Sequence, residues 1–206
     1  MVADTTIRHD TAERHRRKYD DRNSLQRLSL GAFHDSLAGA ITALAPSSVL
    51  DFGCGEAFLL DRLIARGVAL KGYVGVDLRA DAVAEARTRH PGLAFEARDI
   101  FAFPPAGARF DLVLASQVLE HLPDPDRYLA RLAEICAGYF LLTVPHEPWF
   151  RLLNLARGRD LARLGNHPEH VNHWNPHSFA AFVDRRAAVE RVWTVFPFIL
   201  LTARPR

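Results

Sequence analysis

The stretch VLDFGCGEA, residues 49–57, decides the fold of this chain. Its apolar start predicts a strand at Ser48–Phe52, and its glycines predict a tight turn into a helix at Glu56–Arg66. Glycine allows a sharp turn and lets ligand atoms approach the backbone where a Cβ would collide. We therefore expect a ligand across this turn, although glycine pairs also occur in dinucleotide-binding loops and in plain strand-to-helix turns.

The chain beyond this stretch alternates strand-like and helix-like segments. Strands are predicted at Tyr73–Asp77, Leu93–Arg98, Asp111–Ser116 and Tyr139–Val144, and helices at Ala80–Arg89 and Asp126–Cys136. Such alternation is typical of a parallel sheet with crossover helices. Val189–Val195 and Phe198–Ala203 predict two more strands, which a tight turn around Pro197 makes antiparallel. The expected fold is α/β, a mostly parallel seven-stranded sheet with an antiparallel C-terminal hairpin at its edge.

Two segments flank or interrupt this pattern within an expected single domain of residues 1–206. Residues 1–45 predict an N-terminal helical cap, in which a charged run at Thr6–Asp21 precedes a helix at Ser24–Leu44. The inward face of that helix is predicted to consist of Leu25, Leu28, Phe33, Leu37, Ile41 and Leu44. Residues 146–176 break the alternation after the fifth strand, and we interpret them as a lid or acceptor insertion over the ligand-binding end of the sheet.

Composition places few demands on partners. The formal net charge is +2 and 24% of the residues are charged, so neither nucleic acid nor an anionic membrane is required as a partner. Cys54 and Cys136 lie far apart and lack a paired ligand spacing, which favours a reduced protein. No apolar run approaches the roughly 20 residues that span a bilayer, and the polar start lacks the apolar core of a signal peptide. We expect a cytoplasmic protein, monomeric or homodimeric.

Acidic residues end the second and third predicted strands. Asp77 lies 22 residues beyond Gly55, where a carboxylate can accept both hydrogen bonds from a ribose diol. Asp99 could accept from an adenine amino group, although an aspartate that only caps its loop fits that position equally well. Together with the glycine turn, the two acids imply a nucleoside ligand.

These motifs resemble those of the class I S-adenosylmethionine (SAM)-dependent methyltransferases, over residues 49–144 and the terminal hairpin. VLDFGCGEA is similar to the first motif of the family, GVDL to the second, RDI to the third, and FDLVLASQVLEHLPDP (residues 110–125) to the fourth. The resemblance implies a Rossmann-like fold, SAM as cofactor and S-adenosylhomocysteine (SAH) as product. The cofactor-binding residues that it implies are Asp51, Gly53, Cys54, Gly55, Asp77, Leu78, Asp99, Ile100, Ser116, Gln117 and Tyr19.

Rival readings of the same loop remain open. Ala57 replaces the common third glycine of the family, and a nicotinamide dehydrogenase tolerates alanine there too. The carboxylate of Asp51 favours the methyltransferase, because it suits a cationic ammonium and repels a pyrophosphate. A non-catalytic SAM-binding protein is a further alternative. A nucleic-acid methyltransferase is disfavoured, since residues 116–119 read Ser-Gln-Val-Leu instead of an Asn/Asp-Pro-Pro-Tyr motif.

The chemistry of the acceptor needs a base where the nucleophile is a phenol or hydroxyl. The candidates are His170, His173, His146, Glu120 and His121. Within its class the chain resembles the ubiquinone-biosynthesis O-methyltransferase branch, which implies a small, partly apolar acceptor, aromatic or lipid-like, methylated on oxygen with a histidine as base. N- or C-methylation of a natural-product or lipid-like intermediate is the alternative.

The insertion admits several interpretations. An apolar patch of Trp149, Phe150, Leu152, Leu153 and Leu155 stands beside several arginines. It predicts a lid over the acceptor, with weak contact to a membrane surface or ordinary core packing as alternatives. His167, His170 and His173 recur every three residues, so a divalent metal is conceivable. A histidine base is favoured over a metal, because a neutral imidazole has a pKa suited to removing a proton from a phenol.

Overall fold

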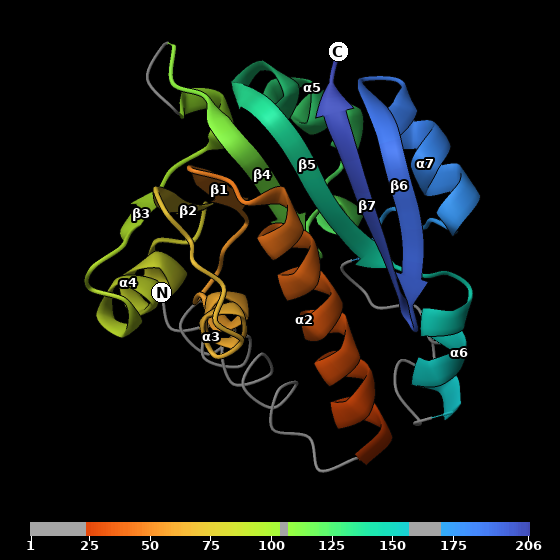
Figure 1. Cartoon of the computed structure of the whole chain (residues 1–206). Coiled ribbons are helices and arrows are strands. Elements are labelled where there is room, and N and C mark those ends of the chain that lie inside the picture. Colours follow the sequence, from red (N-terminus) through yellow and green to blue (C-terminus); the bar gives the residue numbers. More distant parts are fainter. Residues whose placement is uncertain (1–23, 104–106, 157–169) are drawn as a thin grey trace, which may run out of the picture.

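The computed structural model of the chain describes residues 24–103, 107–156 and 170–206, and it contains a seven-stranded sheet (Figure 1). The strands lie in the order β3-β2-β1-β4-β5-β7-β6, of which the first five are parallel. Strand β7 is antiparallel to both of its neighbours. The strands are β1 (Val49–Phe52), β2 (Tyr73–Asp77), β3 (Ala94–Ala97), β4 (Phe110–Ser116), β5 (Cys136–Pro145), β6 (Ala187–Val195) and β7 (Phe198–Pro205). The predicted α/β fold is confirmed.

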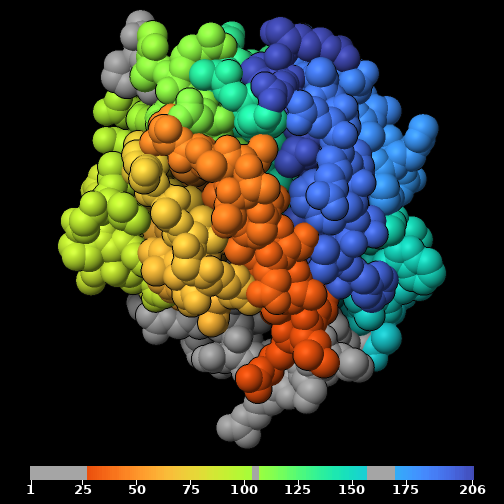
Figure 2. Space-filling model, in the orientation of Figure 1, coloured from red at the N-terminus to blue at the C-terminus, as the bar shows by residue number. Residues whose placement is uncertain are grey.

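Helices cover both faces of this sheet. They are α2 (Ser24–Leu44), α3 (Phe58–Ile64), α4 (Ala80–Arg89), α5 (Pro125–Ile135), α6 (Trp149–Ala156) and α7 (Pro176–Asp184), with two short 3-10 helices, η1 (Ile100–Ala102) and η2 (Leu119–His121). Side chains of α2, α3 and α4 pack on one face, and those of α5 and α7 pack on the other. Figure 2 shows α2 lying along the first face, between α3 and β6.

The central strand β4 divides its residues between two cores. Leu112 and Leu114 pack with the α2 side, whereas Val113 and Ala115 pack with the α5 side. All four side chains are fully buried. A strand buried on both faces reads as a continuous apolar run, which is why this segment was recognisable from the sequence.

The helix α2 matches its predicted bounds, but one residue of its predicted inward face is misplaced. Phe33, Leu37 and Ile41 are buried, as expected for helical spacing. Leu28 is 70% exposed, because the first turns of α2 extend past the edge of the sheet. The buried stripe therefore begins about one turn later than the sequence indicated.

The helix after β1 also begins later than predicted. It starts at Phe58 instead of Glu56, because Ala57 has a left-handed backbone with φ of 63° and precedes the first helical residue. A left-handed residue cannot continue an α-helix. The glycine turn is thus longer than the sequence indicated and includes Glu56.

Part of the predicted insertion has regular structure. Helix α6 lies within it, and residues 157–169 are outside the described part of the chain. The insertion ends where Asn175 caps α7 with a reciprocal capping box that includes Ser178. Among the described helices, none is long and apolar enough to cross a membrane.

Candidate cofactor and acceptor site

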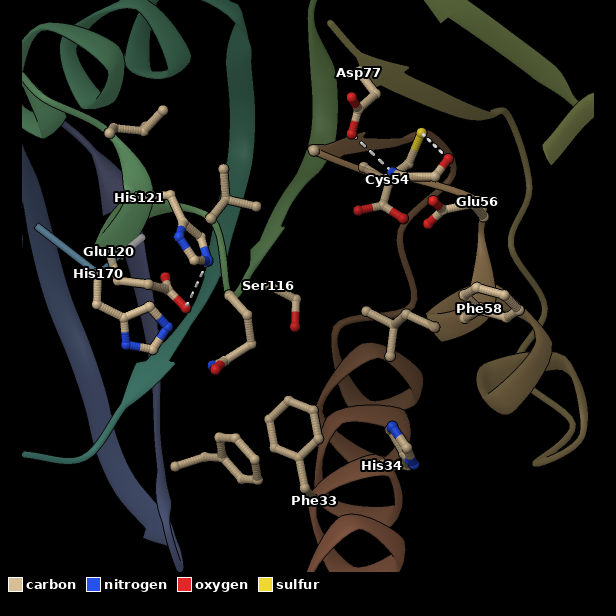
Figure 3. Close-up of a pocket in the computed structure, with 18 of the residues that line it drawn as sticks. Phe33, His34, Cys54, Glu56, Phe58, Asp77, Ser116, Glu120, His121 and His170 are labelled. Atoms are coloured by element: carbon tan, nitrogen blue, oxygen red, sulfur yellow. Dashed lines mark hydrogen bonds and ion pairs between the residues drawn. The ribbon is translucent and has the colours of Figure 1, made fainter. Parts of the chain in front are cut away.

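A cavity of about 590 Å³ opens at the carboxyl ends of β1, β2 and β4. This is the edge at which parallel α/β sheets bind ligands. One side is formed by the glycine turn and the end of β2, namely Asp51, Gly53, Cys54, Gly55, Glu56, Asp77 and Arg79. The other side includes Ser116, Gln117, Val118, Glu120, His121, Leu122, Phe150 and His170. Figure 3 shows Glu120, His121 and His170 on one wall, across from Asp77, Cys54 and Glu56.

The glycine turn is shaped by three residues with a left-handed backbone, Gly53, Gly55 and Ala57. Gly53 has φ of 77° and Gly55 has φ of 52°, values that glycine adopts without the penalty of a Cβ. The amides of Gly53 and Cys54 donate to the carbonyl of Val76, at 2.8 and 3.2 Å. A Cβ on Gly53 would lie 2.5 Å from Cγ2 of Val118, so this position requires glycine for space as well as for conformation. The turn therefore holds the backbone close to both β2 and β4.

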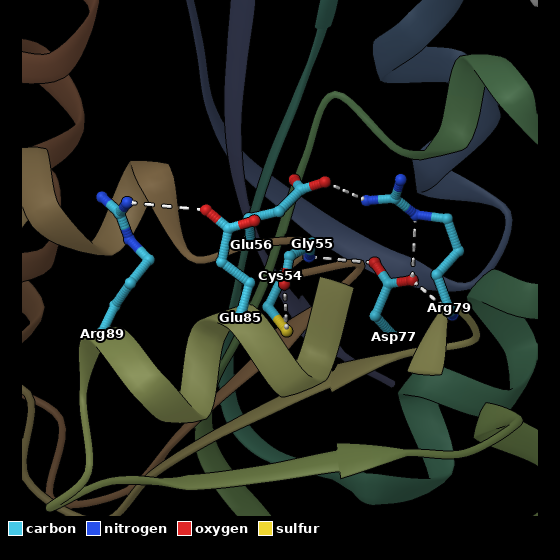
Figure 4. Close-up of polar contacts among 7 residues, drawn as sticks. All are labelled: Cys54, Gly55, Glu56, Asp77, Arg79, Glu85 and Arg89. Carbon is cyan, nitrogen blue, oxygen red and sulfur yellow. Dashed lines mark hydrogen bonds and ion pairs between the residues drawn. The ribbon is translucent and has the colours of Figure 1, made fainter. Parts of the chain in front are cut away.

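Asp77 is held in one orientation by backbone amides. Its Oδ2 accepts from the amide of Gly55 and its Oδ1 accepts from the amide of Arg79, both at 2.9 Å (Figure 4). Each carboxylate oxygen has a further lone pair. Because the side chain lines the cavity, it is placed to accept from two neighbouring hydroxyls of a ligand.

Asp51 lies deeper in the same side of the cavity. Its carboxylate is 4% exposed and accepts a hydrogen bond from the hydroxyl of Tyr73 at 2.7 Å. Burial raises the pKa of Asp51 to about 6, an effect that the Tyr73 hydrogen bond opposes and the charge of Asp77 reinforces. A buried carboxylate of this kind is stabilised by a cation, such as an ammonium group, placed beside it.

Cys54 is a packing residue in this geometry. Its thiol is buried, and burial raises the pKa of Cys54 far above the usual range, so the thiol is protonated at neutral pH. Its sulfur lies 2.9 Å from where a Cβ on Gly75 would stand, so it fills the space that this glycine leaves. A protonated, buried thiol is a poor nucleophile, so Cys54 contributes packing at this position.

Three predicted cofactor residues do not line the cavity formed by the described residues. Asp99 is exposed and caps η1 by accepting from the amide of Phe101 at 3.0 Å, whereas Ile100 is buried in the core. Leu78 is 64% exposed. These three residues stay predictions for an adenine site beyond Asp77. Tyr19 lies outside the described residues.

The end of β4 provides polar groups between the two walls. Ser116 and Gln117 both contact the hydroxyl of Thr143 on β5, at 3.0 and 3.1 Å. Gln117 has φ of 59°, and this left-handed residue turns the chain from β4 into η2. Both residues line the cavity, as predicted for the end of the fourth strand.

The acceptor wall is assembled from two segments that are distant in sequence. The carbonyl of Glu120 accepts from the amides of Val171 and Asn172, at 2.9 and 3.1 Å. The side-chain amide of Asn172 donates to the carbonyls of Leu119 and Leu122. These bonds fix the segment that precedes α7 onto η2.

This docking places three titratable side chains together. The rings of His121 and His170 are 4.9 Å apart and nearly perpendicular, and Nε2 of His121 lies 3.9 Å from Oε1 of Glu120. Potential ligand atoms of the three residues all lie within 4.8 Å of one another. Glu120 and His170 are buried, whereas about a third of the His121 side chain is exposed. We call these three residues the Glu-His-His cluster.

Two other predicted bases lie apart from this cluster. His146 pairs with Trp174 in a short bridge, and burial lowers its pKa. His173 is exposed and faces Glu147, whose pKa burial raises. Neither histidine lines the cavity. His167 falls outside the described residues.

Several lining residues escaped the sequence analysis. Phe33 and His34 on α2 line the cavity, and so do Glu56 and Arg79. His34 is 4% exposed, and burial, with the charges of nearby arginines, lowers its pKa to about 4. Helical spacing assigned Phe33 to the core, and nothing in the sequence separates a core face from a face over a cavity. Of these four residues, only Arg79 has a position that could have indicated a place in the cavity, because it follows Asp77 by two residues.

The fold and the cavity define a nucleoside-binding α/β protein, with a glycine turn, a following acid and a second polar wall. A profile of the methyltransferase domain matches residues 14–186, and the chain belongs to this family. The resemblance to class I SAM-dependent methyltransferases is thereby confirmed.

Two curated relatives have similar sequences. The chain is 35% identical over 127 residues to a trans-aconitate 2-methyltransferase of Methylobacterium nodulans, a match that covers 59% of this chain and 48% of the relative. It is 31% identical over 152 residues to a ubiquinone biosynthesis O-methyltransferase of Methylococcus capsulatus, with 70% and 60% covered. The matched region thus spans about half to three fifths of these relatives.

Solved structures share the fold at lower identity. The magnesium protoporphyrin IX methyltransferase of Synechocystis PCC 6803 with bound SAH aligns with a TM-score of 0.69 and 21% identity, over 96% of this chain and 94% of that one. The PH0226 protein of Pyrococcus horikoshii aligns with a TM-score of 0.67 and 18% identity, over 92% and 96%. The named relatives act on different acceptors, so they do not specify one for this chain.

Proposed function

We propose that this protein is a SAM-dependent methyltransferase that methylates an oxygen of a small, partly apolar acceptor, a phenol or hydroxyl. The observation that supports it most is the placement of the Glu-His-His cluster across one cavity from the glycine turn and Asp77. Family membership supports the reaction class. The geometry supports a division of the cavity into a cofactor half and an acceptor half.

In the cofactor half, each polar side chain has a matching group on SAM. Asp51 would face the ammonium group, and Asp77 would accept from the ribose diol. Asp99 and Ile100 would take the adenine ring beyond the cavity of the described residues. Bound SAM supplies an electrophilic methyl group on its sulfonium, and the residues of the chain need only align the acceptor and remove its proton.

In the acceptor half, His121 is the residue best placed to take that proton. Its imidazole is the most exposed member of the Glu-His-His cluster and lines the cavity. Glu120 and His170 are buried behind or beside it and would hold the ring in position. As the methyl group bonds to the acceptor oxygen, the hydroxyl proton would pass to His121, and SAH would leave as the other product.

The acceptor half also has an apolar floor. Phe33 from α2, Phe150 from α6 and Phe198 from β7 line it, and the rings of Phe33 and Phe198 are 4.6 Å apart. Aromatic side chains bury a flat or partly apolar ligand with little loss of conformational freedom. This floor supports an aromatic or lipid-like acceptor with one polar group directed at His121.

The same cluster offers a second function, the binding of a divalent cation. Two imidazoles and a carboxylate within 4.8 Å fit the ligand preferences of zinc, iron and nickel. A cation there would lower the pKa of an acceptor hydroxyl, so that its proton could pass to water and no side-chain base would be required. We favour the base, so we expect dialysis against a chelator to leave turnover unchanged. Turnover that is lost to the chelator and restored by one cation would support the metal instead.

The cofactor assignment is tested by calorimetric titration with SAH. The wild type is expected to bind at micromolar concentration, and Asp77→Ala is expected to lose binding because the ribose hydroxyls lose their acceptor. Folded wild-type protein that binds a nicotinamide dinucleotide in preference to SAH would contradict the proposal. SAH binding without turnover on any acceptor would instead favour a non-catalytic SAM-binding protein.

The acceptor assignment is tested by incubating the protein and SAM with a panel of neutral phenols, amines and carboxylates. Release of SAH and a mass gain of one methyl group identify the products. Methylated phenols are expected. Turnover confined to amines or carboxylates would contradict oxygen methylation of a phenol or hydroxyl.

A further inference from the structure

Arg79 lies between two acidic side chains at the cofactor half of the cavity. Its Nη2 donates to Oε1 of Glu56 at 2.7 Å, and its Nε lies 3.9 Å from Oδ1 of Asp77 (Figure 4). Glu56 is 4% exposed, whereas about a third of the Arg79 side chain is exposed. Both residues line the cavity. Glu56 belongs to the glycine motif and Arg79 directly follows the GVDL motif, but neither is among the cofactor-binding residues that the resemblance implies.

The Arg79–Glu56 pair is a side-chain link between the glycine turn and the residues that end and follow β2. It adds to the hydrogen bond from the amide of Gly55 to Asp77 and to the backbone bonds from Gly53 and Cys54 to Val76. A Cβ on Gly55 would lie 3.7 Å from Nη2 of Arg79, so the guanidinium lies directly over the turn. The backbone amide of Arg79 also donates to Asp77. One residue therefore contacts both the acid and the turn beside it.

Charge explains why the pair matters for Asp77. Glu56 and Asp77 are two carboxylates on the same side of one cavity, and like charges at short range repel in a partly buried site. The guanidinium between them offsets that repulsion and keeps each carboxylate in place. Loss of the guanidinium would take this counter-charge away from a buried carboxylate, which favours a rearrangement of the turn.

We propose that Arg79, paired with Glu56, is a positioning residue that holds Asp77 and the glycine turn in the geometry that receives the ribose diol of the cofactor. The inference rests on the proposed function, because it requires a ribose at Asp77. Arg79 acts through these two partners and takes no part in the transfer of the methyl group.

The test is a comparison of two ligands, SAH and its 2′-deoxyribose analogue, by calorimetric titration. The wild type should bind SAH more tightly, because the analogue lacks a hydroxyl for Asp77. Arg79→Met should weaken SAH binding about tenfold and weaken binding of the analogue less, so that the preference for SAH shrinks. An equal loss for both ligands, or no loss for either, would overturn the positioning role.

Three further variants separate positioning from folding. Arg79→Lys keeps the charge and should recover part of the preference for SAH. Arg204→Met removes an exposed ion pair with Glu190, also at 2.7 Å, and should bind both ligands as the wild type does. Thermal unfolding of each variant identifies any that has lost its fold.

The double variant Arg79→Met with Glu56→Gln removes both charges of the pair, so the buried side chain at position 56 no longer carries a charge that has lost the Arg79 guanidinium. It should be as stable as the wild type and still show the reduced preference for SAH. Recovery of the full preference in this variant would mean that Arg79 only compensates Glu56, and would overturn the proposal. If the folded wild type binds neither ligand, both this inference and the proposed function fail, whereas wild-type binding with an unchanged Arg79→Met preference removes only the inference.

Discussion

The two halves of the cavity are built in different ways. The cofactor half comes from the ends of two adjacent parallel strands, and its key bond joins Gly55 and Asp77 across 22 residues. The acceptor half joins η2 to the segment before α7, with Asn172 bonded to Leu119 across 53 residues. The bonds of the first half join one turn to the adjacent strand, whereas the second half depends on the docking of a distant loop by backbone and side-chain amides. The cofactor half can thus stay the same in proteins that share this fold, while the acceptor half differs between them.

The largest expected effect separates the two halves by function. His121→Gln should lower turnover by about 10²- to 10⁴-fold, because removal of a general base forfeits the proton transfer to a positioned imidazole. SAH binding should be unchanged, since His121 does not contact the glycine turn. Turnover is measured as SAH release at saturating SAM, and binding by calorimetric titration.

His173→Gln is the matched control for this variant. His173 is three residues from His170 in sequence but is exposed and does not line the cavity, so turnover should stay within about twofold of the wild type. If His173→Gln is the inactive variant and His121→Gln is active, the acceptor wall has been assigned to the wrong histidine. Similar losses of SAH binding in both variants would mean that the two halves are not separable.

A second prediction concerns the backbone of the cofactor half. Gly53→Ala should lower the free energy of unfolding by about 3 kcal/mol, because the new Cβ requires both a left-handed backbone and a shift of Val118. SAH affinity should also fall, since the turn lines the cavity that is proposed to bind the cofactor. Urea denaturation measures the stability. A variant with wild-type stability would show that the turn can adapt to a Cβ. The cofactor half would then be less rigidly fixed than this comparison of the two halves requires.

The difference between the halves also explains what could be predicted from the sequence. The glycine turn and Asp77 were found because they are short-range features, an apolar strand followed by glycines and a strand-end acid. The Glu-His-His cluster was named only as separate candidates, since the docking of His170 on η2 depends on hydrogen bonds of Asn172 that no local pattern indicates. His34 was missed because a residue beside a cavity has the same helical spacing as a residue beside a core. The role of Arg79 was missed because its pairing with Glu56 joins positions 23 residues apart, which no local pattern indicates.

A third prediction uses the raised pKa of Asp51, which rises to about 6 in the folded protein from an ordinary value of 3.8. The folded state then binds more protons than the unfolded state between these values, so this residue lowers stability as pH rises through the interval. Asp51→Asn should therefore be more stable than the wild type by about 2 kcal/mol at pH 7, with the difference vanishing below pH 4. Urea denaturation from pH 4 to pH 7.5 measures it.

The same variant should bind SAH more weakly, because the ammonium group loses its charged partner. For the wild type, affinity for SAH should rise with pH through about 6 as Asp51 ionises. Stability gained together with affinity lost would mark Asp51 as a residue kept for binding at the expense of the fold. A variant that is both less stable and fully able to bind would refute this assignment.

The smallest expected effect comes from the same glycine-to-alanine change in α2, at a residue that does not line the cavity. Gly39 is an exposed residue inside α2, and a Cβ there would meet nothing within 4 Å. Gly39→Ala should raise the free energy of unfolding by about 0.5–1 kcal/mol, because alanine loses less backbone freedom in a helix. SAH affinity should not change. The same substitution would then raise the free energy of unfolding in α2 and lower it in the glycine turn. The cost of Gly53→Ala is therefore due to the strained geometry of the turn. A loss of stability in Gly39→Ala would instead mean that a glycine-to-alanine change is costly even at an exposed helical position, and the cost of Gly53→Ala could not be assigned to the geometry of the turn.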